Sequence, residues 1–405
     1  MTSSMSSEPP PSLQALVARF DERAFELPDR PARVRLSVGG SRAWDVMLAA
    51  GQPRRLVPAS DRDPPAAELR ADEGTWVEMA RDLRHGMRAF REGRLRVRRN
   101  LHLGVGFLAA TGGPQEPGRL RFRQVGTSAG SLSILEAGQG DPVVMLHGLG
   151  ATKASFLPTV AALAGAHRAI ALDLPGFGDS DKPIGAPYDA AFFARSVIAL
   201  LDALGLERAH VIGNSMGGRA ALEVGLLAPT RVGRIALLST SLAWIRPRPW
   251  APYLRLVRPE LGLLQPAPRP VVELVVRRLI PGATRGWTAA GVDEFLRAYM
   301  TPRGRAAFYA AARQIYLEEP DGDRGFWPRL RALEPATLFV WGRRDPLVPL
   351  AFARHVEEAL PAARHVELDC GHVPQLERPS DTHRAIRRFF AEAPLSATRR
   401  KRKVA

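Results

Sequence analysis

The spacing of apolar residues changes once along the chain. In the first part, apolar and polar residues alternate over short stretches such as 32–38 and 42–49. This period of two is typical of strands with one buried face. In the second part, near-continuous apolar runs alternate with helical stretches such as 191–204. Strands that are apolar on both faces indicate a mostly parallel sheet covered on both sides by helices, so the sequence predicts an α/β domain preceded by a different one.

The boundaries follow from composition, because Gly and Pro interrupt both helices and strands. We expect a disordered lead (1–11), a small α+β domain (12–112), a linker (113–119), an α/β domain (120–394) that contains a helical insertion (241–331), and a basic disordered tail (395–405). A chain of 405 residues is also too long for one compact core, which favours two domains.

The first domain is predicted to contain short elements of both kinds. They are an amphipathic opening segment at 13–25, helices at 75–83, 85–92 and 101–110, and strands at 32–38, 42–49, 53–58, 67–71 and 94–97. Asp72 stands where a helix cap is expected, before the helix at 75–83. Nothing here indicates catalysis, because His85 and His102 have no carboxylate or cysteine partner nearby in the sequence.

The second domain opens with a predicted hairpin and continues with six apolar strands. The hairpin strands are 120–125 and 132–137, and the six that follow are 143–146, 169–172, 210–212, 235–238, 338–341 and 365–368. In parallel sheets the active site lies at the carboxyl ends of the strands. The residues directly after each apolar run are therefore the candidates for chemistry.

A serine between glycines follows the strand at 210–212. Ser215 stands in the stretch Gly-Asn-Ser-Met-Gly-Gly, and a helical pattern begins at residue 219. Gly213 and Gly217 leave room for a strained strand-to-helix turn that exposes the serine hydroxyl, the arrangement called a nucleophile elbow. A serine becomes nucleophilic only when a base removes its proton and donors stabilise the resulting oxyanion.

Donors for that oxyanion are predicted on the turn after the first parallel strand. His147-Gly148-Leu149-Gly150 follows residues 143–146, and the backbone N–H groups of Leu149 and Met216 are the expected pair. Gly148 gives the turn its tight path. At this position we interpret His147 as a structural residue and not as a proton carrier.

The base and its orienting carboxylate are predicted after the last two strands. Asp345 follows residues 338–341 and His372 follows residues 365–368, so the chain order is Ser215, Asp345, His372. Asp173 also follows a strand, but it precedes the elbow, and its Gly-rich loop is interpreted as scaffold. Asp369 is interpreted as a surface or capping residue.

These motifs resemble those of the α/β-hydrolase superfamily over residues 120–394. The resemblance implies hydrolysis of an apolar ester or related acyl bond, without a metal or organic cofactor. A serine at the elbow argues against dehalogenases and epoxide hydrolases, which use aspartate there. The motif around Ser215 is also similar to that of carbon–carbon hydrolases of the meta-cleavage type. Those enzymes usually carry a tryptophan directly after the catalytic histidine, where this chain has Val373.

The insertion at 241–331 is helical, interrupted by prolines and rich in apolar residues. Its aromatic and aliphatic residues include Trp244, Trp250, Tyr253, Leu263, Leu264, Trp287, Phe295, Tyr299 and Phe308. It resembles the cap domain that covers the site in many of these enzymes. Such a cap would form an apolar acyl or aromatic pocket that excludes water, although its aromatic residues could equally form its own core.

The first domain resembles the sterol carrier protein family. The resemblance lies in residues 67–71 leading into 76–83, and in residues 92–100, where Asn100 replaces a common glycine. It implies an apolar tunnel for a lipid ligand; a packed domain without any ligand is the alternative. A lipid-binding or transfer protein with an incidental hydrolase scaffold is therefore a further functional hypothesis.

The charge of the chain limits which kinds of binding partner are expected. The net charge is +16, but all but four of the 57 basic residues are arginines and they are spread along the chain, so we expect no nucleic-acid partner. The only concentrated basic run, 399–403, allows at most a peripheral contact with anionic lipid.

A single cysteine, Cys370, excludes an intrachain disulfide. With no signal-like N-terminus, a cytoplasmic location is expected, and the oligomeric state is left open.

Overall fold

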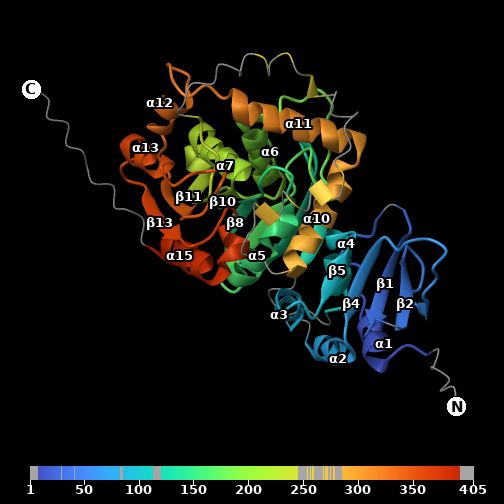
Figure 1. Cartoon of the computed structure of the whole chain (residues 1–405). Coiled ribbons are helices and arrows are strands. Elements are labelled where there is room, and N and C mark those ends of the chain that lie inside the picture. Colours follow the sequence, from blue (N-terminus) through green and yellow to red (C-terminus); the bar gives the residue numbers. More distant parts are fainter. Residues whose placement is uncertain are drawn as a thin grey trace, which may run out of the picture.

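The computed structural model describes residues 8–392 except residues 29, 41, 83–84 and 113–119 and most of residues 245–284. The predicted linker, the basic tail, most of the lead and the first half of the predicted cap lie outside the described residues. Figure 1 shows two bodies, each built on its own sheet, with the helix labelled α10 between them.

The N-terminal domain has a five-stranded sheet in the order β3-β2-β1-β4-β5. Its strands are β1 (Ala32–Val38), β2 (Arg42–Leu48), β3 (Leu56–Pro58), β4 (Ala67–Ala71) and β5 (Arg96–Arg98). The register pairs Leu36 with Trp44 on one side and with Leu69 on the other, so apolar residues line one face. The helices contribute to the same buried core, and they are α1 (Pro11–Ala18), α2 (Glu73–Arg81), α3 (His85–Arg91) and α4 (Leu101–Ala110).

The amphipathic opening predicted at 13–25 is helical only in its first part. Helix α1 ends at Ala18, and the chain then runs to the edge of the second sheet. There the Phe122 amide donates to the Ala24 carbonyl at 2.9 Å, and Phe25 forms a single β-bridge with Phe122. Phe25 therefore packs between the two domains. The pattern of apolar residues along 13–25 does not predict this contact.

The second domain has an eight-stranded sheet in the order β13-β12-β11-β10-β8-β9-β7-β6. Its strands are β6 (Arg121–Thr127), β7 (Gly130–Ala137), β8 (Asp141–Leu146), β9 (His167–Leu172), β10 (Ala209–Asn214), β11 (Val232–Leu238), β12 (Ala336–Gly342) and β13 (Arg364–Leu368). Strands β8 to β13 pair in parallel, whereas β7 is antiparallel to both β6 and β9. The predicted α/β class and mostly parallel sheet are confirmed.

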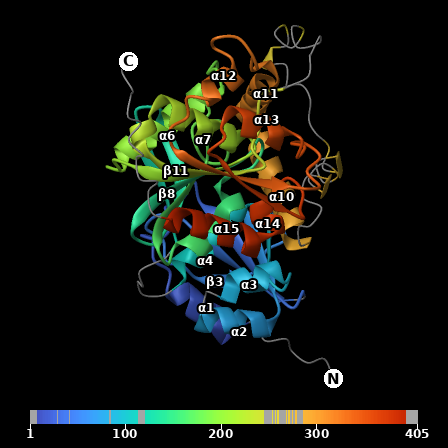
Figure 2. The same ribbon diagram turned by 90° about the vertical axis from the view of Figure 1, so that its left-hand side faces the viewer.

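Helices cover both faces of this sheet, as the apolar runs require. In β8, Val143 and Met145 belong to one buried cluster, and Val144 and Leu146 belong to the other. Helices α6 (Ala190–Ala203) and α7 (Met216–Leu227) lie on one face of the sheet and α15 (Pro379–Ala391) lies on the other (Figure 2). Helix α5 (Leu157–Leu163) packs beside α15. The α5 and α15 cluster continues into the core of the N-terminal domain.

The described part of the insertion between β11 and β12 is helical. It comprises α10 (Arg285–Tyr299), α11 (Pro302–Leu317) and α12 (Phe326–Leu330). Helix α10 lies beside β5 and α4 of the N-terminal domain (Figure 1). Helices α13 (Phe352–Ala359) and α14 (Pro374–Glu377) follow β12 and β13. Among the described residues, none of the helices is both long enough and apolar enough to span a membrane.

Candidate active site

Ser215 lies on a strained turn between β10 and α7. Its backbone has φ 53° and ψ −119°, a combination that non-glycine residues seldom adopt. The neighbouring glycines make the turn possible. A Cβ on Gly213 would lie 2.4 Å from the Gly217 carbonyl oxygen, and one on Gly217 would lie 2.1 Å from the Leu146 carbonyl oxygen. The half-buried serine is thus presented at the carboxyl end of the sheet.

His372 and Asp345 come together from the loops after β13 and β12. The distance from His372 Nδ1 to Asp345 Oδ2 is 2.8 Å, and both side chains are buried. The backbone amides of Leu347 and Val348 donate to Asp345 Oδ1 at 2.8 and 3.0 Å. Burial opposes ionisation, but the His372 contact and the two amides outweigh it, so the pKa of Asp345 lies below its usual range. The carboxyl group is therefore ionised at neutral pH.

Asn214 ties the histidine loop to the elbow. Its side-chain amide donates to the Leu238 carbonyl at 2.8 Å and to the His372 carbonyl at 3.1 Å. The residue before the nucleophile thus binds the backbone of the histidine that would activate it. No sequence pattern assigns Asn214 this role, and the amide beside the serine is the only signal for it in the sequence.

The turn after β8 lies against the nucleophile. A Cβ on Gly148 would lie 3.2 Å from the Cβ of Ser215, so the absence of a side chain permits this approach. Among the residues that the structure describes, the amides of Leu149 and Met216 have no hydrogen-bond acceptor. Two unpaired N–H groups beside a serine can hold an oxyanion.

His147 holds this turn. The Leu174 amide donates to its Nε2 at 3.0 Å, and its Nδ1 lies 2.8 Å from the Gly148 carbonyl oxygen. An acceptor at Nε2 and a donor at Nδ1 require the neutral ring, and burial lowers the pKa of His147 accordingly. With both nitrogens occupied, His147 links the loops after β8 and β9 and has no free nitrogen for proton transfer.

The insertion places aromatic rings next to the same turn. A Cβ on Gly150 would lie 2.7 Å from the Phe295 ring of α10 and 3.2 Å from the Phe308 ring of α11. Tyr299 and Tyr309 join this group through a 2.7 Å contact between their hydroxyls. Several predicted cap residues lie outside the described residues, namely Trp250, Leu263, Leu264 and the side chain of Trp287.

The competing candidates have other surroundings. Asp173 is buried, and its Oδ2 lies 2.5 Å from the Nζ of Lys153; Asp369 is exposed and pairs with Arg344. Burial raises the pKa of the Cys370 thiol to about 12, which keeps it unreactive. Within the described ranges, no group of His, Cys, Asp and Glu side chains is arranged to hold a metal ion.

Lys153 lies near the site, although no sequence motif predicts it there. Its ammonium is fully buried beside two carboxylates, and it is one of only four lysines in an arginine-rich chain. The rarity of lysine is the one signal for it in the sequence. The contact of His102 with Asp179 is likewise not predictable from local sequence, because the two residues belong to different domains.

Comparison with known proteins assigns the family. The model of the alpha/beta hydrolase fold matches residues 141–379, more than half of the chain. This chain belongs to the α/β-hydrolase family. Its hydrolase domain is 30% identical over 288 residues to a 2-hydroxy-6-oxo-6-phenylhexa-2,4-dienoate hydrolase of Burkholderia cepacia, covering 67% of this chain and 94% of that protein. The chain is therefore an enzyme of this family, and several of its relatives are named as hydrolases.

Other relatives of this hydrolase carry different names. An acetyltransferase component of an acetoin cleaving system of Pseudomonas putida is 31% identical over 263 residues; the match covers 62% of this chain and 64% of that protein. A crystal structure of a membrane phospholipase A superimposes with a TM-score of 0.56 at 28% identity, covering 67% of this chain and 85% of that one. The family is thus shared among proteins named for different reactions.

Proposed function

We propose that this protein is a serine hydrolase that cleaves an acyl bond of an apolar substrate through a covalent acyl-enzyme. The observation that carries the proposal is the convergence of Ser215, His372 and Asp345 at the carboxyl edge of one sheet, with the amides of Leu149 and Met216 unpaired beside them. This is the constellation required for nucleophilic attack by a serine.

The tautomer of His372 follows from its contact. An ionised Asp345 can only accept, so the proton of the neutral imidazole is on Nδ1 and the lone pair is on Nε2. Nε2 then takes the proton of Ser215 as its oxygen attacks the substrate carbonyl. Asp345 stabilises the imidazolium that forms and keeps the ring oriented.

The carbonyl oxygen becomes an oxyanion that the amides of Leu149 and Met216 stabilise. When the tetrahedral intermediate collapses, His372 returns its proton to the leaving group and Ser215 carries the acyl group. Water activated by the same imidazole then releases the acid and restores the serine. None of these steps requires a cofactor.

An apolar substrate is supported by the aromatic rings beside the turn. Phe295 and Phe308 contact Gly150, one residue from a proposed oxyanion donor, so the acyl chain would lie against apolar surface. The similarity to a phospholipase A is compatible with a lipid-like ester. A lipid ligand in the N-terminal domain is a separate hypothesis. There, the spaces above Gly104 and Gly106 are filled by Val97 and Phe25, which favours a packed interior at α4.

Cleavage of a carbon–carbon bond next to a carbonyl is the second candidate. It is favoured by the relatives, since a further one, 32% identical over 271 residues, is named a 2-hydroxy-6-oxononadienedioate/2-hydroxy-6-oxononatrienedioate hydrolase of Paraburkholderia xenovorans. Both reactions would use the same serine and base, so the triad is common to both. Val373, in place of the tryptophan expected of such enzymes, favours the ester.

The test is labelling with a fluorophosphonate followed by mass mapping of the modified peptide. We expect modification at Ser215 only. Ser215→Ala should abolish labelling and lower turnover by at least about 10³-fold. Ser196→Ala, which removes a buried hydroxyl on α6, is the control and should keep both the labelling and the turnover of the wild type. A wild-type protein that is not labelled at Ser215 would overturn the proposal.

The bond type is decided by comparing substrates at equal enzyme concentration. One series contains p-nitrophenyl esters of increasing acyl length, and the other contains ring-cleavage dienoates. Turnover of esters alone assigns the ester hydrolase. Turnover of the dienoates with a kcat/KM at least as high as that of the best ester assigns the carbon–carbon hydrolase.

A further inference from the structure

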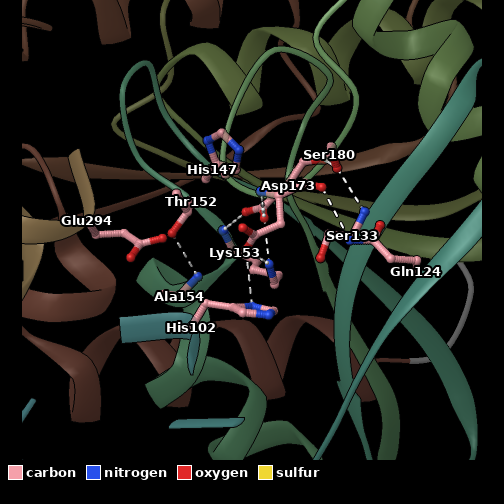
Figure 3. Close-up of polar contacts among 12 residues, drawn as sticks. His102, Gln124, Ser133, His147, Thr152, Lys153, Ala154, Asp173, Ser180 and Glu294 are labelled. Carbon is pink, nitrogen blue, oxygen red and sulfur yellow. Dashed lines mark hydrogen bonds and ion pairs between the residues drawn. The ribbon is translucent and has the colours of Figure 1, made fainter. Parts of the chain in front are cut away.

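A buried group of charged side chains lies where the N-terminal domain, the hydrolase domain and α10 meet. We call it the junction cluster, and it consists of His102, Lys153, Asp173, Asp179 and Arg297. Figure 3 shows His102, from the N-terminal domain, reaching toward Lys153 and Asp173, with His147 on the far side of that pair. The proposed mechanism uses none of these five side chains.

One side of the junction cluster fixes the end of the oxyanion turn. The backbone amide of Lys153 donates to Asp173 Oδ1 at 2.7 Å, and its Nζ donates to Asp173 Oδ2 at 2.5 Å. At the start of the turn, His147 accepts from the Leu174 amide. Residues 147–153, which include Leu149, are therefore held at both ends by the loop that follows β9.

The other side of the junction cluster binds α10 and the N-terminal domain. Asp179 Oδ2 lies 3.3 Å from Lys153 Nζ and 3.2 Å from His102 Nδ1. Asp179 Oδ1 accepts from Arg297 of α10 at 2.7 Å. Burial opposes ionisation of this carboxyl group, but the neighbouring His102, Arg297 and Lys153 outweigh it and hold the pKa of Asp179 well below its usual range. Asp179 is thus a fixed anion shared by three parts of the molecule.

Helix α10 is held by the N-terminal domain through two consecutive carboxylates. Asp293 accepts from Arg98 Nε at 2.6 Å and from the Arg99 amide at 2.8 Å. Glu294 accepts from the Leu101 amide at 3.3 Å. Both carboxylate residues are buried, and Arg99 adopts φ 72°, a left-handed conformation that is strained for a residue with a side chain.

The next residue of the same helix contacts the oxyanion turn. Phe295 follows Glu294 directly, and its ring fills the space above Gly150. A shift of α10 relative to the N-terminal domain would therefore move a ring that rests against the turn. Since donors must lie about 3 Å from the developing oxyanion, a displacement of the order of 1 Å is enough to impair catalysis.

We propose that the N-terminal domain positions the oxyanion turn of the hydrolase by holding α10, with Asp293 and Glu294 as positioning residues. The catalytic consequence rests on the proposed function, whereas the structural consequence, an ordered turn at 147–153, does not. The N-terminal domain is thereby a built-in part of the hydrolase site. Any change that loosens the contact of β5 and α4 with α10 lowers the rate of oxyanion formation.

The test uses Asp293→Ala in the full chain, with Asp45→Ala as the matched control. Asp45 is also buried in the N-terminal domain and also pairs with arginines, Arg33 and Arg35, but on β1 and β2, away from α10. Hydrogen exchange of peptides covering residues 147–153 is measured first, below the unfolding temperature of each protein. We expect exchange at least about tenfold faster in Asp293→Ala and unchanged in Asp45→Ala. Unchanged exchange in Asp293→Ala would overturn the proposal, whatever the activity.

Kinetics then test the catalytic consequence. For a short p-nitrophenyl ester, Asp293→Ala should lower kcat by about 10- to 100-fold and change KM less than about threefold, because turn displacement affects the transition state more than ground-state binding. Asp293→Glu, which keeps the charge, should restore most of kcat. An equal loss of kcat in Asp45→Ala would show a general effect of destabilisation and contradict the positioning role. Failure of wild-type labelling at Ser215 would instead overturn the proposed function alone.

Discussion

Two buried carboxylates at the same edge of the sheet are each paired with a basic side chain, but only one of the two pairs can transfer a proton. Asp345 follows β12 and meets His372 at 2.8 Å, and Asp173 follows β9 and meets Lys153 at 2.5 Å. Burial opposes the Lys153 charge, but Asp173 and Asp179 outweigh it and raise the pKa of Lys153, so the amine stays charged at neutral pH. An imidazole can exchange a proton there, whereas this ammonium cannot. The partner of the carboxylate, and not its place in the fold, separates a catalytic pair from a structural pair.

The largest effect expected from this comparison is on the rate. Asp345→Asn keeps an oxygen for the amides of Leu347 and Val348 but removes the charge that orients His372. By analogy with other triads we expect kcat to fall by about 10³- to 10⁴-fold. The melting temperature should change little. Steady-state ester hydrolysis measures kcat, and circular dichroism measures the melting temperature. A loss of stability in Asp345→Asn as large as that in Asp173→Asn would contradict the distinction between a catalytic and a structural pair.

The second effect is on stability. Asp173→Asn removes the charge beside Lys153 and leaves an ammonium that is 1% exposed with less compensation. Breaking a buried pair in this way costs about 3 to 5 kcal/mol of unfolding free energy. Urea denaturation at neutral pH measures it, with Asp369→Asn on the exposed Arg344 pair as the control, expected to cost less than about 1 kcal/mol. Equal losses of unfolding free energy in Asp173→Asn and Asp369→Asn would contradict the expected difference between the buried and the exposed pair.

The third effect is a dependence of stability on pH that arises at the junction cluster. Burial and the Lys153 charge lower the pKa of His102 to about 3, against 6.5 in the unfolded chain. Between pH 6.5 and 3 the unfolded chain binds a proton that the folded chain does not, so the unfolding free energy falls as the pH falls through this window. The slope from one such group is at most about 1.4 kcal/mol per pH unit.

His102→Gln tests this assignment. We expect the difference in unfolding free energy between pH 7 and pH 5 to shrink by about 2 kcal/mol relative to the wild type. His210, whose pKa burial lowers to about 4, contributes in the same direction in both proteins and cancels in the comparison. A pH slope that is the same with and without His102 would show that this residue does not titrate on unfolding.

The smallest effect compares two helix caps of the N-terminal domain. Asn100 Oδ1 accepts from the Leu103 amide at the start of α4, and Asp72 Oδ1 accepts from the Thr75 amide at the start of α2. Asn100→Ala and Asp72→Ala should each cost about 1 kcal/mol of stability. Only Asn100 adjoins the contact with α10, so only its variant should also lower kcat, by a few-fold. Equal kcat values in the two variants would limit the positioning role to the charged residues.

The structure also gives Asn100 a local role, because its side chain caps α4. The predicted cap at Asp72 is confirmed in the same way. Both caps are local hydrogen bonds within three residues, which is why sequence patterns find them. Phe25 is the opposite case, because its neighbours His102 and Phe122 are far away in the chain.

The sequence by itself determined where the strands lie along the chain and which polar motif follows each strand. In a parallel sheet the carboxyl ends share one edge, so Ser215, Asp345 and His372 had to approach one another once the strands were identified. Only the tertiary structure decided what surrounds them. Arg98 and Asp293 are 195 positions apart, and Lys153 becomes a buried cation only where its own turn, the loop after β9, α4 and α10 meet. No local period records such pairs, because their energy depends on burial that exists only in the assembled fold.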